Sequence, residues 1–109
     1  MVLSFQEQKM HIEFPNKNTM LLSGEVKTIE NYTDIKNAVL GFIATGEKAL
    51  IIEITDSMTI TSAIIGFFTK IIHRDGINLS LLVHDNRLYS LLEDLNLIKL
   101  FNVRHIDSL

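Results

Sequence analysis

Cysteine is absent from the 109 residues of this chain. Its absence excludes disulfide bonds, catalytic thiols and thiolate metal ligands together. A chain without disulfides fits a reducing compartment, and we therefore expect a cytoplasmic protein. The four histidines are scattered and show no metal-ligand spacing, so we expect no metal and no cofactor.

Long apolar runs and clusters of basic residues are missing as well. Apolar stretches such as residues 63–68 are far shorter than the roughly 20 residues that a membrane-spanning helix needs. The N-terminus has neither the basic start nor the apolar core of a signal peptide. The net charge is −3 and the ten basic residues are dispersed, which disfavours direct binding to nucleic acid. A protein partner or a small molecule fits this composition better.

Catalytic motifs are equally sparse. The sequence holds no glycine-rich phosphate loop, nucleophile elbow or pair of catalytic carboxylates. His84 and Asp85 follow an apolar segment and could carry out acid–base chemistry at the end of a strand. Asp85 is explained more simply as a helix cap. Glu25 fits a solvated or turn carboxylate and Arg87 fits solvated surface. We therefore predict that the protein is not an enzyme.

What is present is the composition of one folded domain, which we assign to residues 1–109. Hydrophobic residues make up 47% of the chain and charged residues 21%, as in ordinary globular proteins. The length also corresponds to one domain. No internal repeat or linker interrupts it.

The period of the apolar residues changes along the chain and predicts alternating strands and helices. A turn over residues 15–18 joins the first two strands into a hairpin, and the short run at 49–54 predicts a strand buried on both faces. Residues 97–103 are expected to pack back as a short strand or an irregular segment. The predicted strands are 9–14, 19–23, 49–54 and 78–83, and the predicted helices are about 32–43, 61–74 and 86–95.

The order of these elements predicts an α/β fold. Strands and helices alternate with short connections, so the sheet is expected to be mixed and mostly parallel, with the N-terminal hairpin adding an antiparallel edge strand. About three main helices accompany it. The expected caps are Asn31 or Thr33 and Gly46 for the first helix, and Asp85 or Asn86 and Asn96 for the last.

The helix predicted at 61–74 has two different sides. An apolar stripe should face the sheet, and it consists of Ile60, Ala63, Ile64, Phe67, Phe68 and Ile71. The opposite side is expected to consist of Ser62, Gly66, Thr69, Lys70 and His73. Ile65 and Ile72 lie at the margin, where either a neighbouring helix covers them or they form a docking patch. Ser62 is either an ordinary N-cap or a place where the helix start accepts an anion such as a phosphate.

Three blocks of the sequence follow the signature of one known family. Residues 21–26 (LLSGEV) are similar to an "L-x-G-E-hydrophobic" strand signature, and residues 49–67 to a strand, a "D-S-S-G" motif and a helix. Residues 81–101 are similar to a last strand and a helix ending "L-x-x-x-G-L-x-x-h-F". From about residue 10 to residue 103, the chain thus resembles the STAS domain family, typified by bacterial anti-sigma factor antagonists.

This resemblance places the family's phosphorylated serine at Ser62. Counted without gaps from Glu53, which takes the place of a strand-end aspartate, residues 61–64 fall on the D-S-S-G motif. The other motif positions differ, with Thr61 for the aspartate, Ala63 for the second serine and Ile64 for the glycine. A shifted alignment on Asp56 and Ser57 keeps an Asp-Ser pair but breaks the strand spacing.

The resemblance implies a non-enzymatic regulatory module in signal transduction. Its partner would be an anti-sigma factor with serine-kinase activity or a related switch protein, and phosphorylation of Ser62 would oppose docking; self-association as a homodimer is left open. The replaced aspartate and glycine favour the alternative of a constitutive subunit in a stress-signalling complex or in lipid-transport machinery. The predicted partner-binding residues are Ser57, Thr59, Thr61, Ser62, Ile65, Gly66 and Thr69.

Overall fold

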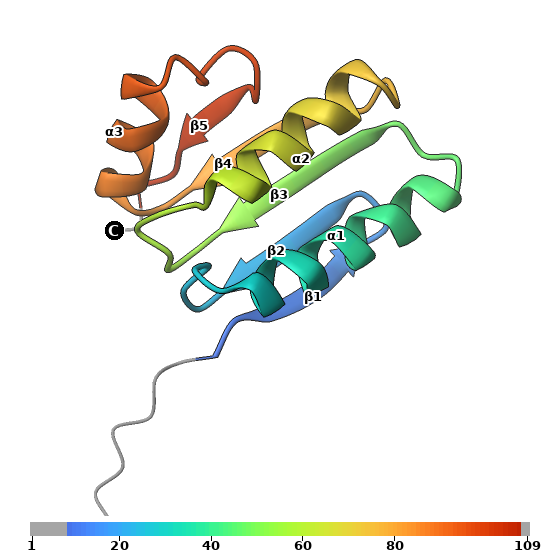
Figure 1. Ribbon diagram of the computed structural model, residues 1–109, viewed down its shortest axis with the longest axis horizontal. Helices are drawn as coiled ribbons and strands as arrows, with labels where there is room; N and C mark the ends of the chain where they lie inside the picture. The colour runs from blue at the N-terminus through green and yellow to red at the C-terminus, as the bar shows by residue number, and fades with distance from the viewer. Residues whose placement is uncertain (1–8, 108–109) are drawn as a thin grey trace, which may run out of the picture.

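The computed structural model describes residues 9–107, which form a five-stranded sheet with three helices (Figure 1). This confirms the predicted α/β fold. The strands are β1 (His11–Asn16), β2 (Thr19–Ser23), β3 (Ala49–Ile54), β4 (Asn78–Val83) and β5 (Val103–His105). The helices are α1 (Ile29–Ala44), α2 (Ser62–His73) and α3 (Asn86–Asp94).

The strands lie in the sheet in their order along the chain, from β1 to β5. Strands β2 to β5 are parallel, and only β1 pairs antiparallel, as the edge strand of the N-terminal hairpin. Each parallel connection advances by one strand in the same direction. Because such crossovers are right-handed, the three helices lie on the same face of the sheet. Figure 1 shows α1 and α2 side by side across it.

The core lies between this helical layer and the sheet. Alternate strand residues such as Leu22, Ile52 and Leu81 are buried beneath the helices, while their neighbours, such as Ile51, point to the other face and are half-buried. The prediction that β3 is buried on both faces is therefore wrong, because no helix among residues 9–107 covers the second face. No described helix is long and apolar enough to cross a membrane.

Helix α1 begins earlier than predicted. Its N-cap is Thr28, which accepts a hydrogen bond from the Asn31 amide, while the Asn31 side chain accepts from the Thr28 amide at 3.0 Å. This reciprocal capping box shows that the predicted caps, Asn31 and Thr33, are wrong. The periodicity missed the first turn because Ile29 is 83% exposed and does not join the apolar stripe. Gly46, with φ +90°, does follow the helix end as predicted.

The hairpin also differs in detail from the prediction. Strand β1 continues through Pro15 to Asn16, with an irregular register after Glu13, so the turn is shorter than expected. Proline is tolerated there because β1 is the edge strand of the sheet formed by residues 9–107. The bounds of β2, β3 and β4 match the predicted ones.

Candidate functional site

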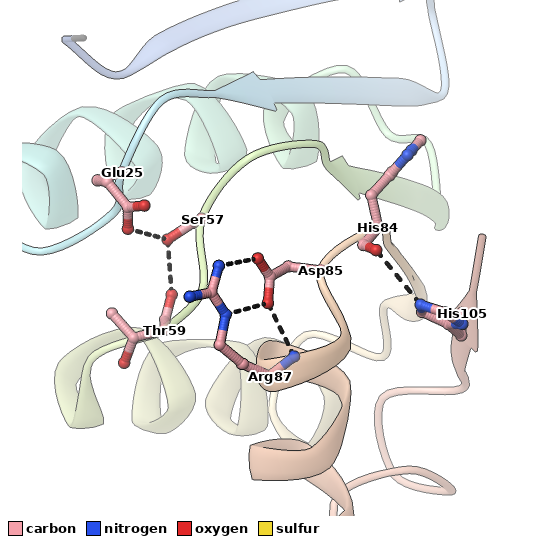
Figure 2. Close-up of polar contacts among 7 residues, drawn as sticks. All are labelled: Glu25, Ser57, Thr59, His84, Asp85, Arg87 and His105. Atoms are coloured by element: carbon pink, nitrogen blue, oxygen red, sulfur yellow. Dashed lines mark hydrogen bonds and ion pairs between the residues drawn. The ribbon is translucent and has the colours of Figure 1, made fainter. Parts of the chain in front are cut away.

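Polar side chains gather at the edge of the sheet where the parallel strands end. Glu25 follows β2, Ser57 follows β3 and Asp85 follows β4. Because the carboxyl ends of neighbouring parallel strands meet at one edge, loops from distant parts of the sequence come together there. Figure 2 shows these side chains around the loop that leads into α2.

Ser57 is fully buried and ties this loop to the segment after β2. Its hydroxyl oxygen accepts a hydrogen bond from the Val26 amide at 3.0 Å. Its single proton faces two acceptors, the Thr59 carbonyl at 2.8 Å and a Glu25 carboxylate oxygen at 3.2 Å (Figure 2). The predicted partner contact of Ser57 is therefore wrong, because the side chain points inward. Burial also removes the shifted alignment, since a kinase cannot reach this hydroxyl in the folded chain.

Asp56 makes a second connection between the same two segments. Its carboxylate accepts hydrogen bonds from the Gly24 amide at 2.8 Å and from the Thr55 hydroxyl at 3.1 Å. Gly24 adopts φ +83°, and a Cβ built on it would lie 2.5 Å from the Lys9 carbonyl oxygen. Only glycine fits this close approach of two backbones. The close approach of Lys9 therefore explains why glycine occupies position 24 of the LLSGEV segment.

Helix α2 begins immediately after this loop. Thr61 is the N-cap, and its hydroxyl accepts a hydrogen bond from the Ile64 amide at 3.3 Å. Ser62 is the first residue of the helix and is exposed. The N-cap interpretation of Ser62 is therefore wrong, because Thr61 takes that role. The first turn carries no acidic side chain, so no carboxylate of α2 itself occupies the positive end of the helix dipole.

The buried side of α2 is narrower than predicted. Ala63 is exposed, and its predicted place on the sheet-facing stripe is wrong. Ile64, Phe67, Phe68 and Ile71 are buried as expected. The two marginal side chains, Ile65 and Ile72, are half-buried and pack against the core.

The remaining predicted contact residues differ in what they offer to a partner. Gly66 is exposed, and a Cβ built on it would meet no atom within 4 Å. Thr69 is half-buried and donates its hydroxyl to the Ile65 carbonyl at 2.8 Å, within the helix. Thr59 is half-buried, and its carbonyl is engaged by Ser57. Of these three residues, only Gly66 is exposed to a partner.

The start of α3, at the same edge, already holds a negative charge. Asp85 is the N-cap and accepts from the Arg87 amide at 2.8 Å. The Arg87 guanidinium donates two further hydrogen bonds to this carboxylate, at 2.7 and 3.1 Å (Figure 2). These bonds lower the pKa of Asp85 to about 2. The hydrogen bonds to Asp85 and its negative charge, together with the charge of the Glu25 carboxylate, raise the pKa of Arg87.

The histidines form separate contacts in the structure. His84 Nε2 lies 2.7 Å from a Glu53 carboxylate oxygen on the adjacent strand, and both side chains are half-buried. His105 Nε2 donates to the His84 carbonyl at 3.3 Å (Figure 2), and its ring packs beside Tyr89. Within residues 9–107 there is no group of three or more His, Cys, Asp or Glu side chains that could hold a metal ion.

Sequence reasoning missed two contacts of charged residues at this edge. Glu25 was interpreted as a solvated or turn carboxylate, yet it accepts a hydrogen bond from buried Ser57. Arg87 is exposed as predicted, but its contact with the Asp85 cap was not foreseen. The position of Glu25 directly after Gly24, within the L-x-G-E-hydrophobic signature, could have indicated that this carboxylate has a structural role. The approach of Glu25 to Ser57 spans 32 positions, and no local pattern contains it.

Comparisons with known proteins add no assignment. No model of a known protein family matches the chain, and no curated protein matches it. Any functional reading therefore depends on the three sequence blocks and on the geometry described above.

Proposed function

We propose that this chain is a non-enzymatic regulatory module of the STAS type, acting like an anti-sigma factor antagonist. In the unmodified state it docks on a protein partner, an anti-sigma factor with serine-kinase activity or a related switch protein. The start of α2 and the outward side of that helix form the contact. Phosphorylation of Ser62 weakens this docking.

The observation that carries this proposal is the position of Ser62. Its side chain is exposed at the first residue of α2, where a kinase could reach it without unfolding the chain. Free amides of the first helical turn and the helix dipole favour an anion there. A phosphate of about −1.5 to −2 charge would therefore leave the fold intact. It would still oppose docking, because burying it against a partner costs desolvation.

Two measurements test this proposal. Intact mass analysis of the protein isolated from its native host should detect a phosphoryl group that maps to Ser62. Calorimetric titration of an anti-sigma factor with serine-kinase activity from the same host should give an affinity for Ser62→Ala at least about tenfold higher than for Ser62→Asp, or about 1.4 kcal/mol. Equal affinities of the two variants would count against the switch.

A second candidate function keeps the fold without the switch. The hydroxyl of Thr61, at the position of the family's aspartate, is occupied as the N-cap, and Ile64, at the position of the glycine, is buried. Neither side chain helps a kinase to recognise the loop. These departures support a constitutive subunit of a stress-signalling or lipid-transport assembly. A stoichiometric complex that is insensitive to kinase and phosphatase would favour this candidate.

A further inference from the structure

A groove runs between α1 and α2 on the outer surface of the helical layer. Its volume is about 440 Å³. We call it the α1–α2 groove and define it by its lining residues: Tyr32, Lys36 and Leu40 from α1, Ala63, Gly66, Phe67, Lys70 and Ile71 from α2, and Arg74 and Asp75 beyond α2.

The floor of this groove is apolar and is hollowed by small residues. The rings of Tyr32 and Phe67 meet edge to face across the two helices, with centroids 6.3 Å apart. Leu40 is 44% exposed. Ala63 is exposed, and beside Gly66 there is open space where another residue would carry a side chain. An inserted apolar side chain would therefore find partners without displacing the core.

The rim of the groove is positively charged, although the chain as a whole has a net charge of −3. Lys36, Lys70 and Arg74 line it, against a single carboxylate from Asp75. Lys36 Nζ lies 5.9 Å from the centre of the Tyr32 ring. No ion pair between these three cations and a carboxylate occurs among residues 9–107. The rim thus offers three cations to an external anionic group.

We propose that the α1–α2 groove receives an acidic amphipathic helix of the partner. An apolar stripe of that helix fits the floor, and carboxylates beside the stripe meet the cationic rim, as in helix-in-groove recognition. A concave site between two neighbouring helices suits a helix better than a flat lipid surface. This inference rests on the proposed function and specifies the chemistry of the partner.

The groove also explains why phosphorylation of Ser62 should weaken docking and not strengthen it. Ser62 lies four residues before Gly66, so the two positions are neighbours on one side of α2. A phosphate on Ser62 would place negative charge at the end of the groove. It would repel the carboxylates of the docked helix, and phosphorylation would therefore weaken docking.

A titration with designed peptides tests the groove directly. The probes are a synthetic amphipathic helical peptide with leucines on one side and glutamates beside them, and the same peptide with lysines in place of the glutamates. We expect the glutamate peptide to shift the NMR amide signals of Ala63, Gly66 and Lys70, and to bind at least about tenfold more tightly, or about 1.4 kcal/mol. Equal binding of the two peptides, or shifts confined to another surface, would overturn the proposal.

Variants of the chain show whether the groove itself binds. Gly66→Leu should fill the groove and reduce binding of the glutamate peptide at least about tenfold, whereas Gly41→Leu in α1 should not. Both glycines are exposed in helices with open space around them, so the pair is matched for effects on the fold, which circular dichroism checks. Lys36→Glu with Lys70→Glu should shift the preference toward the lysine peptide. Undiminished glutamate-peptide binding by Gly66→Leu would contradict the proposal.

Two further arms separate the alternatives. Vesicles of phosphatidylglycerol and phosphatidylcholine should leave the groove signals unchanged; shifts at the same residues with vesicles would instead identify a membrane-binding face and overturn the proposal. Ser62→Asp should weaken the glutamate peptide relative to Ser62→Ala. Groove binding that is equal in both variants would support the groove and count against the phosphorylation switch. If the partner bound more weakly to Ser62→Asp but the glutamate peptide did not bind, the phosphorylation switch would be supported and the groove proposal would be contradicted.

Discussion

The starts of α2 and α3 lie at the same edge of the sheet but differ in charge. Helix α3 is capped by a carboxylate, Asp85, which Arg87 holds with two hydrogen bonds. Helix α2 is capped by the neutral hydroxyl of Thr61, and the exposed Ser62 follows it. Each start has first-turn amides without a partner inside the helix and a positive dipole end. At α3 these favourable interactions are already used by a carboxylate, whereas at α2 they remain available to an added phosphate.

The two serines near the start of α2 have different structural roles. The loop before α2 is held from inside by Ser57, which is buried and bonded to the segment after β2. The hydroxyl at position 62 contributes nothing to that network. A serine that stabilises the loop and a serine that is open to chemistry are therefore separated by five positions.

The largest effect should come from breaking the inner support of α2. Ser57→Ala removes the acceptor of the buried Val26 amide and should lower the free energy of unfolding by about 1–3 kcal/mol. Ser62→Ala is the matched control and should change it by less than about 0.5 kcal/mol. Urea unfolding of both variants measures the difference. Equal destabilisation by the two substitutions would contradict the distinction between the serines.

A smaller effect should come from making the start of α2 resemble that of α3. Ser62→Asp adds a negative charge to the first turn and should raise the free energy of unfolding by about 0.3–1 kcal/mol at low ionic strength. The gain should shrink as salt is added. Urea unfolding at low and high salt checks this. A loss of stability would show that the helix start does not favour an anion.

The smallest effect should come from removing the charge at α3, because Arg87 is exposed and solvent screens its contact with Asp85. Asp85→Asn keeps a good N-cap but loses the ionic part of the contact with Arg87. The pKa of Asp85 falls from 3.8 to about 2 on folding, so its stabilisation is present above pH about 4 and is lost as the pH falls through about 2. The difference in unfolding free energy between wild type and Asp85→Asn should therefore shrink over that range. A difference that is independent of pH would contradict this assignment.

Much of the fold could be predicted because its signals are local. Strands β2, β3 and β4 have the predicted bounds, since each is an apolar run between turn residues. Gly46 and Asn96 stand at the predicted helix ends with positive φ, a conformation that glycine and asparagine adopt most readily. The start of α1 was missed because its capping residue, Thr28, precedes an exposed isoleucine.

The candidate site was predictable only in part. The exposure of Ser62 at the start of α2 followed from helical spacing, but the burial of Ser57 did not. Ser57 stands in the loop before α2, and its burial depends on Glu25 and Val26, which lie 32 and 31 positions earlier. The α1–α2 groove escaped prediction for the same reason, because Tyr32 and Phe67 meet only across two helices.

The order and type of the elements could be inferred from the amino-acid sequence alone, because periodicity, turns and most caps involve residues within a few positions of one another. Only the tertiary structure decided which hydroxyl is buried, which side of α2 remains open and where the cations gather. Those properties depend on which segments approach through the sheet and across the helical layer. Residue type fixes what a side chain can do, but its distant neighbours decide whether water or a partner reaches it.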